Sequence, residues 1–161
     1  MALRSDLSGA ACPIARGSDI LADPWVLLIL REVFAGNRRF DGIARETGGA
    51  ESVISKRLAL LVDAGVLGRR PYRDNGRERA EYVLTDAGAD VLPVLHALAR
   101  WGDEHVEPPV AGMHLRIVCL GCGEEPPSAD WCPTCAHALT VRTTGWGKAR
   151  TPDVLVELGA V

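Results

Sequence analysis

One stretch constrains the fold of this chain more than any other, residues 51–64 (ESVISKRLALLVDA). Four of its apolar residues recur at the spacing of a single helix face: Ile54, Leu58, Leu61 and Val62. This period predicts an amphipathic helix packed on a core. The opposite face carries short side chains and one cation: Ser52, Ser55, Lys56 and Ala59, with Arg57 on the flank. A polar face this thin can approach base edges and phosphates in a DNA groove.

A shorter helix is predicted immediately upstream, over residues 40–47, with Phe40, Ile43 and Ala44 turned inward. The tripeptide Gly48-Gly49-Ala50 follows as a tight turn. A helix, a short glycine-containing turn and a second helix make a helix-turn-helix, in which the second helix enters the DNA groove.

Positive charge is concentrated in the same part of the chain. Residues 38–79 contain ten Lys and Arg but only six Asp and Glu, whereas the 161-residue chain has a formal net charge of −3. The overall balance argues against a protein that coats nucleic acid generally, while the local excess suits a DNA-binding surface. We expect a cytoplasmic protein without a membrane partner, because no secretory signal or bilayer-spanning run is present.

A β-hairpin is predicted directly after the helix-turn-helix. Two extended runs, residues 66–71 and 79–84, flank a segment whose Asp74-Asn75-Gly76 is a turn signal. In this position a hairpin forms the wing of a winged helix, and Arg73 and Arg77 would lie near neighbouring phosphates. The alternative is that these arginines only solvate the edge of the hairpin.

Three more helices complete the predicted fold. The first opens at Cys12-Pro13 and runs to about Leu21, and the second spans 25–34 after the start signal Asp23-Pro24. The third is a long helix over residues 86–106, which Pro93 should bend. Its apolar stripe is expected to pair with a second copy of the chain. The stripe consists of Val91, Leu95, Leu98 and Trp101.

The order of these segments resembles the HxlR family of bacterial winged-helix transcription regulators. The resemblance covers residues 12–105 and runs through CPIARGSDILADPWVLLILREVFAGNRRFDGIARETGG, SVISKRL, LVDAGVLGRRPY, EYVLTDAG and LPVLHALARWGDEH. It implies a homodimer in which the N-terminal and long C-terminal helices pair and present two recognition helices to a palindromic site on double-stranded DNA. By position, it assigns Ser52, Ser55, Lys56 and Arg57 to the recognition helix and Arg73 and Arg77 to the wing.

The resemblance leaves the effector open between a small molecule and a redox signal. Cys12 matches a cysteine that serves as a thiol sensor in some relatives of the family. The alternative for Cys12 is a small buried residue at the dimer helix. Exposure and thiol pKa would separate these two roles.

A second constellation lies beyond the resemblance. Two Cys-x-x-Cys knuckles, Cys119/Cys122 and Cys132/Cys135, are separated by nine residues and flanked by predicted strands at 113–118 and 139–143. Four thiolates in this arrangement predict a zinc ribbon holding one structural Zn²⁺ per chain. Iron in a rubredoxin-type site, disulfides or an empty site are the alternatives, and His137 could compete as a ligand.

The predicted fold class is mainly α with a small β-wing, a winged helix-turn-helix, plus a small β zinc-ribbon-like C-terminal module. The predicted domains are residues 1–107 for DNA binding and dimerisation and residues 108–161 for the ribbon. The predicted function is sequence-specific transcriptional regulation, with no catalysis. Its rivals are an iron redox protein or metalloenzyme built on the cysteines, and a protein-interaction module that does not bind DNA.

Overall fold

The computed structural model describes residues 6–151 and 153–158. The chain divides into two compact units. The first contains the chain up to Val33 and residues Asn37–Thr85, and the second contains Phe34–Gly36 and the chain from Asp86 onward. The domain boundary predicted after residue 107 lies within this second unit. The division into a DNA-binding domain and a ribbon module stays a prediction. Among the described residues, no helix is both long and apolar enough to span a membrane.

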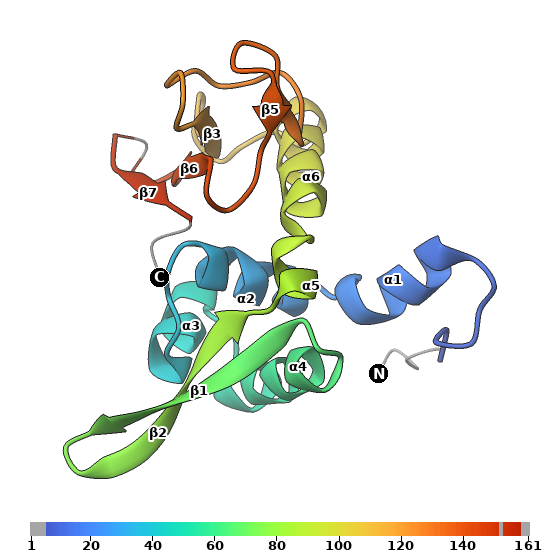
Figure 1. The fold of residues 1–161 in the computed structure, drawn as a ribbon, viewed down its shortest axis with the longest axis vertical. Helices are drawn as coiled ribbons and strands as arrows, with labels where there is room; N and C mark the ends of the chain where they lie inside the picture. Colours follow the sequence, from blue (N-terminus) through green and yellow to red (C-terminus); the bar gives the residue numbers. More distant parts are fainter. Residues whose placement is uncertain (1–5, 152, 159–161) are drawn as a thin grey trace. The chain divides into compact units, whose positions relative to one another are not determined.

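The first unit is built from helices followed by one hairpin (Figure 1). Its elements are α1 (Pro13–Leu21), α2 (Pro24–Phe34, whose last residue belongs to the second unit), α3 (Phe40–Thr47), α4 (Glu51–Asp63), β1 (Leu67–Asp74) and β2 (Arg77–Leu84). The helices predicted at 13–21, 25–34, 40–47 and 51–64 are confirmed to within one residue at each end.

Helix α2 forms the spine of this unit. Asp23 begins it, because its Oδ1 accepts hydrogen bonds from the backbone N–H groups of Trp25 at 2.9 Å and Val26 at 3.4 Å. The apolar residues that follow are buried: Val26, Ile29, Leu30 and Val33. Arg31 holds the buried carboxylate of Glu32 through its Nε at 3.0 Å, so this charge is paired within the helix.

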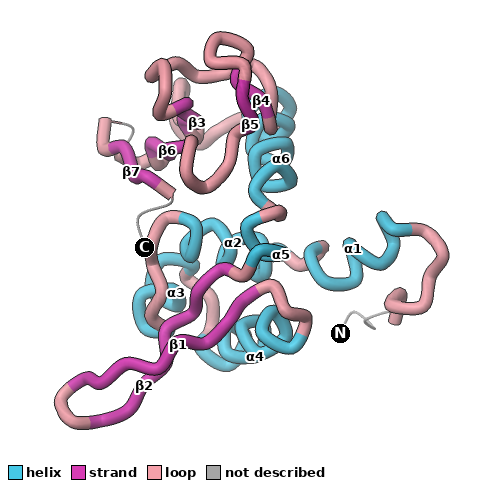
Figure 2. Tube along the Cα trace, in the orientation of Figure 1, coloured by secondary structure: helices cyan, strands magenta, loops and turns pink. Residues whose placement is uncertain are grey.

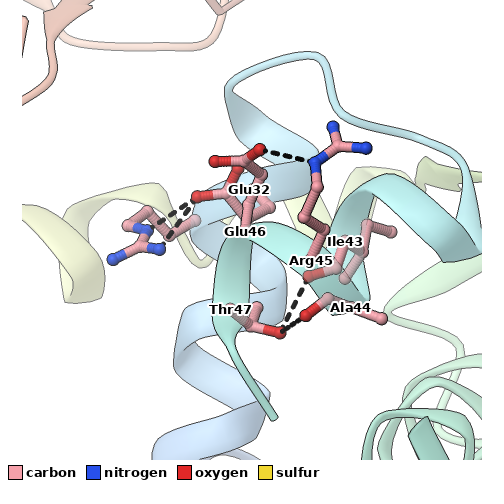
Figure 3. Close-up of polar contacts among 7 residues, drawn as sticks. Glu32, Ile43, Ala44, Arg45, Glu46 and Thr47 are labelled. Atoms are coloured by element: carbon pink, nitrogen blue, oxygen red, sulfur yellow. Dashed lines mark hydrogen bonds and ion pairs between the residues drawn. The ribbon is translucent and has the colours of Figure 1, made fainter.

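The turn between α3 and α4 depends on two glycines. Helix α3 ends at Gly48, whose φ of 72° is left-handed, and Thr47 Oγ1 donates to the Ile43 and Ala44 carbonyls of the last turn (Figure 3). At Gly49 a Cβ would lie 2.7 Å from Ile54 and 2.9 Å from Trp25. The predicted tight turn is therefore confirmed, and it brings α4 close against α2.

Strands β1 and β2 form an antiparallel hairpin that extends away from α3 and α4 (Figures 1 and 2). Asn75 and Gly76 make its turn with φ values of 48° and 77°, the conformation that Asn-Gly favours in two-residue hairpin loops. The strands are longer than predicted and pair from Leu67↔Leu84 to Asp74↔Arg77.

The second unit combines two helices with two small sheets. Its elements are α5 (Asp86–Ala89), α6 (Leu92–His105), β3 (Arg116–Cys119), β4 (Trp131–Cys132), β5 (His137–Ala138), β6 (Thr144–Gly147) and β7 (Leu155–Glu157). Strand β6 lies between β3 and β7 in one antiparallel sheet, and β4 pairs with β5 in the other.

Two sequence predictions in this unit are wrong. The single helix expected over residues 86–106 is divided into α5 and α6. Proline has no N–H and its ring clashes with the carbonyl four residues earlier, which for Pro93 is Ala89, the last residue of α5. The strand expected at 139–143 is instead a turn, in which the Thr143 N–H donates to the Thr140 carbonyl at 3.1 Å, and β6 begins at Thr144.

The second unit has an apolar core of its own. Trp146 is 1% exposed and its ring centroid lies 5.8 Å from that of Phe34. Val91 and Leu95 are also buried, so the apolar stripe predicted for dimerisation is partly wrong. The large apolar side chains that α6 leaves exposed are Val94 (48%), Leu98 (46%) and Trp101 (58%).

Candidate nucleic-acid interface and metal centre

Helix α4 presents its polar face to solvent, as the sequence predicted. Ser52, Ser55 and Lys56 are exposed, whereas Ile54 and Leu58 on the opposite face are fully buried. In the described part of the chain, Lys56 takes part in no ion pair. The backbone N–H groups at the start of α4 have no side-chain cap. A helix N-terminus with uncapped N–H groups and a free cation can meet phosphates and base edges.

Arg57 has a different environment from its neighbours on α4. Its Nε donates to Asp23 Oδ2 at 2.7 Å, and both side chains are about one-third exposed. Since the other oxygen of Asp23 caps α2, this carboxylate joins the start of α2 to the middle of α4. The sequence indicated Asp23 as a cap, but it carried no local signal for this second contact, which spans 34 residues.

Some of the arginines on and near the hairpin are paired with carboxylates, and others are not. Arg70 donates to Glu81 at 2.9 Å, and Arg39 lies 3.8 Å from the same carboxylate. The hydrogen bond from Arg70 lowers the pKa of Glu81. Arg73 and Arg77, beside the Asn75-Gly76 turn, are exposed and form no ion pair with any described residue. Arg73 and Arg77 thus have no ion pair among the described residues and lie at the tip, where the wing hypothesis needs free cations. Nearer the base of the hairpin, Glu81 holds Arg70 and Asp41 lies 3.6 Å from Arg79.

Cys12 is exposed and directly precedes α1. The exposure does not suit a residue buried within one chain. Its proposed role as a thiol sensor stays a prediction, as does a role at the dimer helix.

The four knuckle cysteines come together in the second unit. Their Sγ atoms all lie within 4.8 Å of one another, with Cys122 and Cys132 3.6 Å apart and Cys119 and Cys135 3.9 Å apart. Four sulfurs placed tetrahedrally at about 2.3 Å from one Zn²⁺ are separated by about 3.8 Å. The donor set therefore fits a single tetrahedral ion, with two ligands near the strands β3 and β4 and two in the turns that follow them.

The sulfurs have very different proton affinities in the absence of metal. Burial opposes ionisation of Cys119, but the backbone N–H groups of Cys122 and Gly121 outweigh it and lower the pKa of Cys119 to about 6. The Cys122 sulfur and then burial raise the pKa of Cys135 to about 12. One thiolate is therefore already formed at neutral pH, and metal binding must displace protons from others.

Gly121 makes this packing of sulfur possible. A Cβ at this position would lie 3.1 Å from Cys135 Sγ and 3.4 Å from His137 Nε2. The backbone at Gly121 therefore approaches the sulfur of Cys135 closely. His137 is the nearest imidazole, with Nε2 3.5 Å from Cys119 Sγ.

Comparison with known proteins agrees with this architecture. The family model named HxlR-like helix-turn-helix matches residues 20–109. Mb3122 of Mycobacterium bovis, named as an HTH-type transcriptional regulator, is 40% identical over 124 residues that cover 70% of this chain and 78% of that protein.

Two solved structures named as transcription factors are also similar. PA1607 is 31% identical with a TM-score of 0.69, and the match covers 84% of this chain and 93% of that one. PA1374 from Pseudomonas aeruginosa is 32% identical with a TM-score of 0.52, covering 80% and 86% of the two chains. These shares exceed what residues 1–109 alone could supply, so the similarity continues beyond the span of the family model.

Proposed function

This chain belongs to the HxlR-like helix-turn-helix family of DNA-binding transcriptional regulators, and we propose that it acts as a homodimer on a palindromic operator. The observation that carries the proposal is the exposed face of α4, where Lys56 has no ion pair among the described residues and the helix N-terminus has no side-chain cap.

The two basic surfaces have different roles in this proposal. Ser52, Ser55 and Lys56 contact base edges and so determine sequence preference, while Arg73 and Arg77 contact phosphates beside the groove. Arg57 acts mainly by orienting α4, because Asp23 already engages its Nε.

Binding to operator and to random DNA at several salt concentrations tests this division. Arg77→Ala should weaken binding to both DNAs alike and reduce the salt slope by about one, as expected for the loss of a phosphate contact. Lys56→Ala should weaken operator binding by about 1–3 kcal/mol more than random binding. Arg142→Ala removes an exposed arginine of the second unit and serves as the charge control. Equal losses on the two DNAs for Lys56→Ala would refute the base-contacting role.

Dimerisation is supported by apolar surface on the two helices that pair in this proposal. Helix α1 has no fully buried residue, and its Ile14 is 79% exposed. Helix α6 exposes Val94, Leu98 and Trp101 at the i, i+4, i+7 spacing of one face. A nine-residue helix is marginal on its own in water. A second copy of the chain would cover these faces and give the molecule the two-fold symmetry of a palindrome.

The cysteine centre is proposed to hold one structural Zn²⁺ per chain through Cys119, Cys122, Cys132 and Cys135. Support comes from the sulfur separations, which match a tetrahedral thiolate site. Elemental analysis should find one zinc per chain and the protein should be colourless. A red protein containing iron would instead favour the rubredoxin-type alternative.

A further inference from the structure

We propose that His137 is a reserve ligand of the metal centre, able to take the coordination position of Cys135 when that thiolate is lost. The inference rests on the metal site proposed above. It adds a fifth metal-binding side chain and a second complete ligand set: Cys119, Cys122, Cys132 and His137.

The distance from His137 to Cys119 is that of two ligands of one metal ion. In a tetrahedral site with Zn–S near 2.3 Å and Zn–N near 2.0–2.1 Å, a nitrogen and a sulfur ligand are separated by about 3.6 Å. His137 Nε2 lies 3.5 Å from Cys119 Sγ. The imidazole nitrogen therefore already stands at the spacing of neighbouring ligands, although the four sulfurs suffice to fill a tetrahedron.

The second argument is the orientation of the ring. His137 Nδ1 lies 2.9 Å from the Ala138 carbonyl oxygen. A carbonyl can only accept, so Nδ1 carries the hydrogen, and Nε2, on the side of Cys119, is the nitrogen that can offer a lone pair to a metal ion. Metal-bound histidines are usually oriented by this kind of hydrogen bond from the other ring nitrogen.

The third argument identifies which cysteine His137 can replace. Cys135 Sγ and His137 Nε2 are the two atoms nearest to the position of a Cβ on Gly121, at 3.1 Å and 3.4 Å, and Cys119 Sγ follows at 3.6 Å. Both are also neighbours of Cys119, at 3.9 Å and 3.5 Å. Exchanging one for the other leaves the Cys122–Cys132 pair, 3.6 Å apart, in place.

The exchange of ligands matters because Cys135, the cysteine that His137 would replace, is partly exposed. Cys119 and Cys132 are 0% and 1% exposed, whereas Cys135 is partly exposed. Cys135 is therefore a sulfur that a thiol-modifying reagent can reach, and it shares with His137 the close approach to Gly121. Cys122 is partly exposed, as Cys135 is, but none of the described histidines is hydrogen-bonded to it. Cys122 therefore provides a matched control.

The experiment compares Cys135→Ala and Cys122→Ala, each alone and combined with His137→Ala, in the full chain. Zinc content and competition with a chromophoric chelator measure metal binding. Cys135→Ala should keep one zinc per chain, and adding His137→Ala should weaken its zinc affinity at least about tenfold. Cys122→Ala should lose affinity to the same extent with or without His137. Cys135→Ser, closer in volume, repeats the test should the alanine variant fail to fold.

Cobalt provides a second readout. Co²⁺-loaded Cys135→Ala should retain tetrahedral d–d bands, while its thiolate-to-cobalt absorption falls to about three-quarters because three sulfurs replace four. An affinity of Cys135→Ala that does not depend on His137, or the same dependence in Cys122→Ala, overturns the proposal. A wild-type chain that binds no metal would overturn the metal site itself, which is a separate outcome.

Discussion

His96 is a buried histidine with both ring nitrogens engaged. Its Nδ1 donates to the Ala129 carbonyl at 2.7 Å, and its Nε2 accepts from the indole Nε1–H of Trp146 at 2.9 Å. The bond from Trp146 requires the neutral ring, because Nε2 must keep its lone pair to accept it. Burial lowers the pKa of His96 below its ordinary value of 6.5, with Arg100 acting in the same direction and the Ala129 carbonyl opposing it.

This arrangement predicts a pH dependence for the second unit. Because the folded state binds the proton less tightly than the unfolded chain, the stabilisation by neutral His96 is fully present above pH 6.5. It is lost as the pH falls from there toward the lowered pKa. We expect the Trp146 indole N–H resonance to broaden and the melting temperature to drop over this range. His96→Gln, which stays neutral, should flatten the dependence, and identical pH profiles for the two proteins would contradict the assignment.

At the scale of elements, the cysteine cluster and the Trp146 core consist of different residues of the second unit. Leu139 is the buried apolar residue packed with the cysteines. Strand β6 instead contributes Trp146, which contacts Phe34 and His96. Because this core does not include the cysteines, we expect dependence on metal only in the cysteine knuckles and the β4–β5 hairpin.

Removal of the metal tests this distinction. Chelation should increase hydrogen exchange over residues 119–139, where metal binding supplies the folding free energy, and leave residues 144–147 protected. The same treatment at lower pH should need less chelator, because thiolates such as Cys135, with a pKa raised to about 12, must compete with protons. Loss of protection from hydrogen exchange throughout the second unit would show that the Trp146 core is not stable without metal.

The elements that the sequence predicted well carry local signals. Asp23-Pro24 marks the start of α2, and Asn75-Gly76 marks the hairpin turn. The four-cysteine cluster was also predictable, because the ligand spacing is itself the signal.

The sequence predictions that failed concern contacts between residues that lie far apart in the chain. Helical periodicity does not predict that Val91 and Leu95 are buried. It also gives no sign of the hydrogen bond between His96 and Trp146, which are 50 residues apart. Periodicity showed which positions of α6 are apolar, but it could not say which of them the later strands would cover. The ion pair between Arg57 and Asp23 was missed for the same reason.

At the scale of the whole molecule, the dimer proposal predicts the effect of one acidic substitution on α6. Val94→Asp should give a monomer at micromolar concentration in light scattering, because a charge within an apolar interface is left unpaired. Val154→Asp is the matched control, because Val154 is 59% exposed and Val94 is 48% exposed. This variant should have the same molecular mass in light scattering as the wild type. A wild-type monomer, or a Val94→Asp dimer, would contradict an interface on this face.

Recognition of a symmetric DNA site is the central proposal for this protein, and a footprint on an operator selected from random sequence tests it most directly. Two copies of α4 related by two-fold symmetry should protect two half-sites about 10–10.5 base pairs apart, centre to centre, or a multiple of that distance. The two protected sequences should be inverted repeats, and Lys56→Ala should abolish both protections together. Selection that enriches no sequence, or protection of a single half-site by a monomer, would contradict the account.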